Sequence, residues 1–172
     1  MSERLDFVRS KIVSVEQAER LVAMYQMKNE KVVFTNGCFD ILHLGHISYL
    51  AEAAAMGNRL VVGINSDLSV KTLDKAPNRP INDQLARMNV VAALGFVDLV
   101  VLFDNETPYK LIQKLQPDIL VKGGDYDANE VNLESKKYIV GSDIVKERGG
   151  SVVTIKLVEG YSTTRIIEKS KS

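Results

Sequence analysis

The chain has 172 residues, and its 22 lysines and arginines balance 22 aspartates and glutamates. This length allows one domain with a sizeable buried core, and the balanced charge gives no overall field that would attract nucleic acid or an anionic membrane. We therefore expect small-molecule partners, no nucleic acid and no membrane. The one cysteine, Cys38, excludes an internal disulfide, and no cysteine spacing typical of a metal site is present. The charged N-terminus lacks a signal-peptide core, so we expect a cytoplasmic protein.

Hydrophobic periodicity predicts strands and helices in alternation along almost the whole chain. A first helix at 15–27 begins with a capping box formed by Ser14 and Gln17. The predicted strands cover residues 31–34, 60–64, 97–103, 118–121 and 152–158. Further helices are predicted at 46–55, at 83–93, from Thr107-Pro108 to just before Pro117, at 134–148 and from 162 onward, with long polar loops at 67–82 and 127–133.

This alternation is typical of an α/β fold, and we predict a Rossmann-like, doubly wound, mostly parallel five-stranded sheet with helices on both faces. In the common strand order, the sheet reverses its direction of growth between the first and fourth strands, and ligands bind at the carboxyl ends of the strands there. Those ends carry residues 35–46 and 122–126. Two segments far apart in the sequence are therefore expected to meet at one site.

Residues 35–46 connect the first strand to the next helix and hold both histidines of the chain, His43 and His46. The free N–H groups at a helix start favour an anion, Gly45 allows close approach of the backbone, and two imidazoles can donate to phosphate oxygens. Two alternatives stay open: a helix cap with a core histidine, and a zinc-binding pair that no cysteine or third histidine completes. The glycine signatures of dinucleotide-binding and P-loop proteins are absent from the sequence.

Two motifs resemble those of a known family. Gly37-Cys38-Phe39-Asp40-x-x-His43-x-Gly45-His46 resembles the signature of the nucleotidyltransferases that include glycerol-3-phosphate cytidylyltransferase, and Tyr161-Ser162-Thr163-Thr164 resembles their I-S-T-T motif. Within that family, Asn65-Ser66-Asp67, Arg79-Pro80-Ile81, residues 121–126 and residues 159–164 are most similar to the adenylyltransferases of ADP-heptose synthesis. The resemblance implies a single nucleotidyltransferase domain, 1–172, with an N-terminal helical extension at 1–30 and a catalytic core at 31–169.

The resemblance also implies a reaction and its ligands. A sugar 1-phosphate, expected to be D-glycero-D-manno-heptose 1-phosphate, attacks the α-phosphorus of ATP and gives ADP-heptose and pyrophosphate for lipopolysaccharide or surface glycan synthesis. Mg²⁺ is expected to be held mainly by the ATP phosphates, with no protein metal site. A separate sugar kinase is implied upstream. The apolar face of the first helix serves either a homodimer or the chain's own sheet.

By the same resemblance, four side chains are expected to be catalytic: His43, His46, Lys71 and Arg87. The residues expected to contact the nucleotide are Thr35, Asn36, Gly37, Cys38, Phe39, Asp40, Gly45, His46, Lys122, Gly123, Asp125, Tyr161, Ser162, Thr163 and Thr164. Those expected at the substrate phosphate or sugar are Asn65, Asp67, Lys75 and Arg79. Ordinary structural roles remain as alternatives: solvated loop charges for Lys71, Lys75 and Arg79, an ion pair of Arg87 with Asp83, a plain turn at 123–125 and a helix cap at 162.

One departure from the family pattern bears on the substrates. Where the cytidylyltransferases have R-T-E-G-I-S-T-T, this chain has Leu157-Val158-Glu159-Gly160-Tyr161 before Ser162. This departure argues against CTP and glycerol phosphate, the substrates of those family members, as substrates of this chain. The alternatives that stay open are a cytidylyltransferase for glycerol 3-phosphate or a similar phospho-alcohol, an FMN adenylyltransferase and a non-catalytic nucleotide-binding module.

Overall fold

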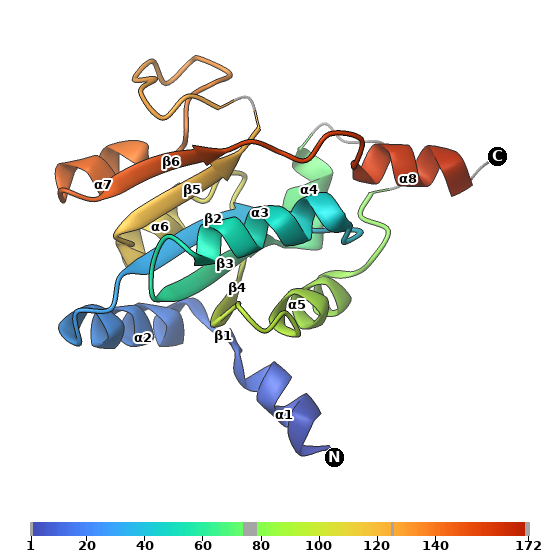
Figure 1. Cartoon of the computed structure of the whole chain (residues 1–172), viewed down its shortest axis with the longest axis horizontal. Coiled ribbons are helices and arrows are strands. Elements are labelled where there is room, and N and C mark those ends of the chain that lie inside the picture. The colour runs from blue at the N-terminus through green and yellow to red at the C-terminus, as the bar shows by residue number, and fades with distance from the viewer. Residues whose placement is uncertain (1, 74–78, 125, 171–172) are drawn as a thin grey trace.

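A parallel sheet of six strands lies at the centre of the protein in a computed structural model that describes residues 2–73, 79–124 and 126–170 (Figure 1). Its strand order is β1-β4-β3-β2-β5-β6, and each neighbouring pair is parallel. The strands are β1 (Ile12–Val13), β2 (Val32–Gly37), β3 (Arg59–Asn65), β4 (Leu99–Phe103), β5 (Ile119–Gly123) and β6 (Ser151–Ile155). The prediction of a doubly wound α/β sheet is confirmed, and the predicted number of five strands is wrong by one.

The extra strand is β1, which has two residues and pairs with Val100 and Val101 of β4. The other five strands follow the predicted order, because β2 lies between β3 on one side and β5 on the other. The predicted reversal between the first and fourth of the expected strands is therefore confirmed. It brings the segment after β2 and the segment after β5 to the same edge of the sheet.

Helices cover both faces of this sheet. One core contains Tyr49 and Leu50 of α3 (Leu44–Ala54) and Val91 of α5 (Gln84–Ala92), together with one set of strand side chains. The other core contains side chains of α2 (Val15–Met27), α6 (Tyr109–Leu115) and α7 (Ser142–Glu147) and the alternate strand residues, such as Val32 and Phe34. Because both faces are covered, the strands are apolar without alternation. The remaining helices are α1 (Glu3–Ser10), α4 (Asp67–Thr72) and α8 (Thr163–Ser170).

Local signals explain where several helices begin. The predicted capping box of α2 is confirmed, because Gln17 N donates to Ser14 Oγ and Ser14 N donates to Gln17 Oε1. The prediction of a continuous polar loop at 67–82 is wrong in its first part, where Ser66 caps the short helix α4 through Ser69 N. Across the described ranges, no helix has the length and apolar character that a membrane span requires.

The prediction of one helix at 134–148 is also wrong, because α7 begins only at Ser142. Gly141 precedes it with φ at +84°, outside the helical region. A Cβ atom built there would lie 2.6 Å from Ile112 Cδ1. The glycine therefore both breaks the helical path and allows the loop to pass close to α6.

Candidate functional site

The segment between β2 and α3 holds the two histidines in a stacked pair. The imidazole centroids of His43 and His46 are 3.9 Å apart with an interplanar angle of 21°, and the Phe39 ring meets His46 edge-on at 5.3 Å. Phe39 has φ at +46°, so the chain turns sharply before it enters the helix. The pair therefore stands at the N-terminus of α3, where N–H groups and the helix dipole favour an anion.

His43 occupies the N-cap position of α3, and burial lowers its pKa from the ordinary value of 6.5. Its Nδ1 atom is buried and has no hydrogen-bond partner among the residues that the structure describes. His43 occupies the position that the helix-cap alternative predicts, but its side chain makes no capping hydrogen bond.

Gly45 lies where the two sequence motifs meet. A Cβ atom built on Gly45 would lie 3.1 Å from Cε1 and Nδ1 of His43 and 3.4 Å from Cβ of Tyr161. The start of α3 therefore packs directly against the segment that leads into α8. Ser162 caps α8, since Arg165 N donates to Ser162 Oγ at 3.1 Å.

A cavity of about 560 Å³ opens between these two helix starts, and we call it the histidine cavity. Its volume lies within the range of about 300–1,000 Å³ that is typical of small-molecule sites. It carries two cationic side chains, Arg165 and Lys169, and one acidic one, Glu159. The lining residues are His43, Leu44, Glu159, Gly160, Tyr161, Ser162, Arg165, Ile166 and Lys169.

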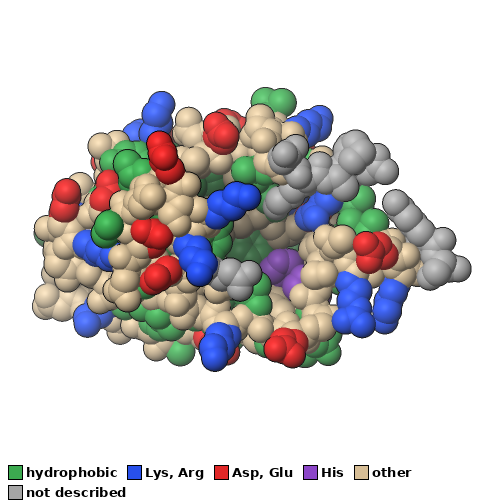
Figure 2. Space-filling model, turned by 90° about the horizontal axis from the view of Figure 1, so that it is seen from above, with side chains coloured by type: hydrophobic (Ala, Val, Ile, Leu, Met, Phe, Trp, Pro, Cys, Tyr) green, Lys and Arg blue, Asp and Glu red, His purple; other side chains and the backbone are tan. Residues whose placement is uncertain are grey.

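A second cavity of about 400 Å³, which we call the strand-end cavity, lies over the carboxyl ends of the strands. Figure 2 shows a hollow in this face with Lys and Arg side chains around it and a histidine beside it, but no histidine lines the strand-end cavity itself. Two lysines line the strand-end cavity, Lys122 and Lys136, and so does the carboxylate of Glu106. The other lining residues are Asn36, Gly37, Cys38, Asn65, Leu73, Thr107, Pro108, Tyr126, Tyr138 and Val140.

Lys122 is fixed across the point where the sheet reverses. Its Nζ atom, at the end of β5, donates to Asn36 Oδ1 on β2 at 2.8 Å, and it lies 5.5 Å from the centroid of the Tyr126 ring. The charge therefore sits between the two segments that the sequence predicts to meet. This geometry presents a cation to an anionic group at the carboxyl edge of the sheet.

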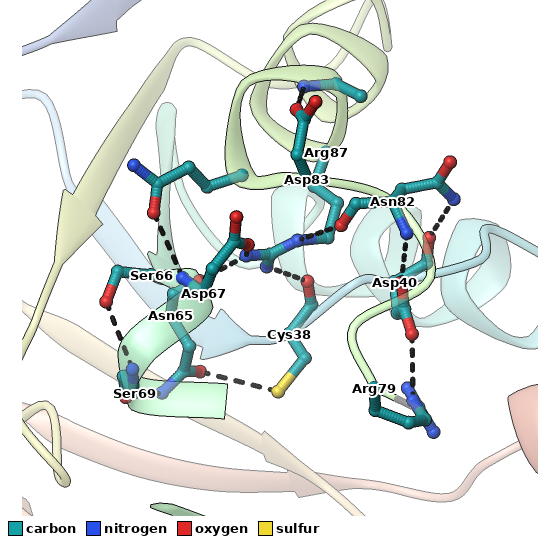
Figure 3. Close-up of polar contacts among 12 residues, drawn as sticks. Cys38, Asp40, Asn65, Ser66, Asp67, Ser69, Arg79, Asn82, Asp83 and Arg87 are labelled. Atoms are coloured by element: carbon teal, nitrogen blue, oxygen red, sulfur yellow. Dashed lines mark hydrogen bonds and ion pairs between the residues drawn. The ribbon is translucent and has the colours of Figure 1, made fainter. Parts of the chain in front are cut away.

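A buried carboxylate organises the loop before α5 (Figure 3). The Asp40 side chain is fully enclosed and accepts hydrogen bonds from Arg79 Nε, Ile81 N and Asn82 N at 2.8–2.9 Å. Arg79 is only 11% exposed. Asp40 and Arg79 were expected at the nucleotide and the substrate, respectively, but in the described structure they hold each other and line neither cavity.

Thr35 and Gly123 take part in packing beneath the site. Thr35 Oγ1 lies 2.6 Å from the Tyr49 hydroxyl, which donates to the carbonyl of Val121 at 3.1 Å. Burial raises the pKa of Tyr49 to about 12, so this phenol remains a donor at neutral pH. A Cβ atom on Gly123 would lie 2.8 Å from Leu157 Cδ2 and 3.1 Å from Tyr49 Cε2, so the glycine lets these side chains pack closely against the end of β5.

Arg87 is also enclosed, and its guanidinium contacts only protein groups among the described residues. It donates to Cys38, Asn65 and Asn82 carbonyls and to the Asp67 carboxylate. The expected alternative pair with Asp83 is not formed, because Asp83 Oδ1 instead caps α5 through Ala86 N.

The other expected site residues are distributed as follows. Lys71 is exposed on α4, two residues before Leu73 of the strand-end cavity. Thr163 is buried and Thr164 is exposed in the first turn of α8. Lys75 and Asp125 lie outside the described residues. Sequence reasoning missed the cavity residues Glu106, Lys136, Tyr138, Arg165 and Lys169; of these, only Glu106 follows a strand end closely enough to have been found by the topology argument.

The stacked histidine pair at the start of α3 faces the start of α8, and such an arrangement of helix N-termini and imidazoles can bind phosphate groups. The model of the cytidylyltransferase-like family matches residues 34–169, and the chain belongs to that family. The predicted resemblance to this family is confirmed.

More particular relatives are also found. The chain is 52% identical over 161 residues to the bifunctional protein HldE of Gluconobacter oxydans, and the match covers 94% of this chain and 32% of that protein. It is 54% identical over 161 residues to the bifunctional protein HldE of Campylobacter concisus, and that match covers 94% of this chain and 31% of that protein. The chain therefore spans about a third of the length of these curated relatives.

A solved structure is similar as well. The lipopolysaccharide core biosynthesis protein from Thermoplasma volcanium is 29% identical, with a TM-score of 0.57, and the match covers 77% of this chain and 99% of that one. The matched region is nearly the whole length of that protein.

Proposed function

We propose that this chain transfers the adenylyl group of ATP to a sugar 1-phosphate, with a heptose 1-phosphate as the acceptor. An oxygen of the acceptor phosphate forms a bond to the α-phosphorus. The bond from the α-phosphorus to the oxygen that bridges to the β-phosphate breaks, and pyrophosphate leaves with that oxygen. The acceptor phosphate is already an anion at neutral pH, so the reaction needs no general base, and positioning and charge neutralisation carry the catalysis.

The observation that carries this proposal is the meeting of the two histidines with the start of α8. His43 and His46 stack at the start of α3, and Gly45 brings that turn against Tyr161. Both helix starts offer N–H groups to phosphate oxygens, and the imidazoles add donors where negative charge accumulates. In the proposed complex, the histidine cavity holds the nucleotide, with its triphosphate beside the histidine pair.

The strand-end cavity is the proposed compartment for the acceptor. Lys122 and Lys136 supply positive charge for the sugar phosphate. The Glu106 carboxylate and the Tyr138 hydroxyl, which donates to Asp143 Oδ1, can accept hydrogen bonds from sugar hydroxyls. This assignment moves the expected nucleotide contacts Asn36, Gly37, Cys38 and Lys122 to the acceptor side of the reaction. The cavity of about 400 Å³ is large enough for a ligand of this class.

Magnesium fits this site as an ion carried by the substrate. Within the described ranges, no group of three or more His, Cys, Asp or Glu side chains is arranged to hold a metal. Mg²⁺ keeps several waters and is usually held by substrate phosphates with few protein ligands. When bound with ATP, it would neutralise charge on the phosphates that leave.

Two family features point to the heptose branch. The relatives named HldE are about half identical to this chain over more than nine tenths of its length, and the Thermoplasma relative is titled a lipopolysaccharide core biosynthesis protein. The residues at 65–67, 79–81 and 159–164 resemble the same branch. We expect a separate sugar kinase to supply this acceptor before the step.

Pyrophosphate release tests the proposal. Each of ATP and CTP is offered with heptose 1-phosphate, glycerol 3-phosphate or FMN, in the presence of Mg²⁺, and product mass identifies the adduct. The fastest release is expected with ATP and heptose 1-phosphate. Faster release with CTP and glycerol 3-phosphate, or with ATP and FMN, would overturn the assignment. ATP binding without release from any pair would indicate the non-catalytic module.

The variant His46→Ala separates binding from chemistry. Loss of one transition-state donor is expected to lower kcat by about 10²-fold or more, while the dissociation constant of ATP changes little. Unchanged kcat would contradict the role proposed for this imidazole.

Three expectations from the sequence stay predictions. They are the domain division at residue 30, the homodimer and the cytoplasmic location.

A further inference from the structure

Arg87 is buried at the point where three site segments meet. Its side chain is 0% exposed, and all three guanidinium nitrogens donate. Nη1 donates to the Cys38 carbonyl at 2.6 Å, Nη2 to the Asn65 carbonyl at 2.8 Å and to Asp67 Oδ1 at 2.7 Å, and Nε to the Asn82 carbonyl at 3.0 Å. Figure 3 shows these partners arranged around one guanidinium.

The partners of Arg87 belong to three segments at the carboxyl edge of the sheet. Cys38 follows β2, Asn65 ends β3, Asp67 begins α4, and Asn82 precedes α5. Buried carbonyl oxygens need donors, and a planar guanidinium can serve several of them at fixed angles, whereas the ammonium group of lysine cannot. Arg87 therefore fixes the distances between these segments.

The arrangement continues from Arg87 to the histidine turn. Asn82 accepts from Arg87 through its carbonyl and donates to Asp40 Oδ1 through its backbone N–H. Asp40 lies three residues before His43, and its enclosed carboxylate also pairs with Arg79. Two carbonyl partners of Arg87, on Cys38 and Asn65, belong to residues that line the strand-end cavity. Arg87 itself lines neither cavity in the described structure.

We propose that Arg87 is a positioning residue, which fixes the wall of the strand-end cavity relative to the histidine turn and so aligns the acceptor with the nucleotide. This inference rests on the proposed function for its kinetic readout. It replaces direct phosphate contact as the role of Arg87. The guanidinium acts on the reaction through the backbone at 38–40 and 65–67.

Arg87→Lys and Arg59→Lys form a matched pair of variants. Arg59 lies at the opposite end of β3, where it pairs with Glu30 at 2.6 Å and with Asp98 at 3.1 Å. Both substitutions remove an arginine fork from an ion pair, but only Arg87 contacts the site segments. Chemical denaturation first establishes the conditions under which each variant is folded.

Arg87→Lys is expected to lower kcat by about tenfold and to raise KM for the acceptor, because misplacement of reacting groups by a fraction of an ångström costs rate, while the dissociation constant of ATP changes by less than about twofold. Arg59→Lys is expected to leave kcat, the KM for the acceptor and the dissociation constant of ATP within about twofold of the wild type. If folded Arg87→Lys keeps the wild-type kcat and acceptor KM, the positioning role is wrong.

Amide hydrogen exchange tests the same inference without substrate. Arg87→Lys is expected to accelerate exchange in residues 38–43 and 65–67, and Arg59→Lys is not. The two proposals can thus fail separately. Absence of turnover in the wild type would overturn the proposed function, whereas unchanged amide exchange in Arg87→Lys would overturn the positioning role of Arg87. If Arg87→Lys does not fold, Asp67→Ala decides, since it removes the one carboxylate partner, which is 31% exposed. The same changes in exchange and acceptor KM are expected, in weaker form, and their absence would contradict the inference.

Discussion

The variant Gly45→Ala places one methyl group between the two motifs of the site. The new Cβ atom would lie 3.1 Å from two atoms of the His43 imidazole and 3.4 Å from Tyr161 Cβ. Ordinary contacts between such atoms lie at about 3.5–4.0 Å. The imidazole must therefore withdraw by a few tenths of an ångström, or the start of α8 must move.

The size of the effect follows from two opposing terms. Alanine is favoured over glycine in a helix by about 1 kcal/mol, and overpacking by one methyl group costs about 1–3 kcal/mol, so the net loss of stability is about 2 kcal/mol or less. Misplacement by about 1 Å can cost about 10²-fold in rate, and a shift of a few tenths of an ångström scales to about three- to fivefold. We expect a reduction in kcat of at least that size, because the methyl group also stands where phosphate would approach.

Urea denaturation and pyrophosphate release measure the two quantities separately. Gly95→Ala is the matched control, because no atom of the described residues, apart from Gly95 and its two chain neighbours, lies within 4 Å of a Cβ built there. This control is expected to keep the wild-type kcat. A Gly45→Ala variant that is folded and turns over as fast as Gly95→Ala would refute the proposed contact between the histidine pair and the nucleotide.

Two further predictions concern charge. Lys136→Gln is expected to raise KM for the acceptor by about tenfold, the scale of a lost charge-assisted hydrogen bond, without changing the affinity for ATP. Its exposed neighbour provides the control variant Lys137→Gln, and equal KM values in the two variants would remove Lys136 from the acceptor site. Because burial lowers the pKa of His43, the unfolded chain binds more protons, and the free energy of unfolding is expected to fall as the pH drops below about 6.5. Denaturation at several pH values should show a weaker dependence for His43→Gln, and an identical slope would contradict this.

Sequence patterns predicted those parts of the fold that depend on local signals. Five buried strands stand out as apolar runs, and the capping box at Ser14 specifies the start of α2. The two residues of β1 are too few to show a period, and their pairing with β4 arises only in the tertiary structure. Likewise, Gly141 costs little in helix propensity, but its positive φ and its contact with Ile112 end the helical path at that point.

In the candidate site, too, some features could be predicted from the sequence and others could not. The motifs at 37–46 and 161–164 could be found by resemblance, and the strand order explains why Asn36 and Lys122 meet. The partners of Arg87 and Asp40 could not be found, because most of them are backbone groups, and all of them lie on segments brought together by folding. Sequence reasoning predicted ligand contacts for both side chains, with an ion pair to Asp83 as the alternative for Arg87, because the sequence alone does not show whether a charged side chain also has protein partners.

The two cavities draw on separate parts of the chain, and this division gives the scaffold a modular character. The histidine cavity uses residues 43–44 and 159–169, whereas the strand-end cavity uses strand ends, residues 106–108 and the segment around 126–140. Under the proposed assignment of the two cavities, acceptor range would diverge by exchange of one surface segment while the nucleotide half stays intact. Grafting residues 126–140 from a family member with another acceptor would show this directly, if acceptor preference changes and ATP affinity does not.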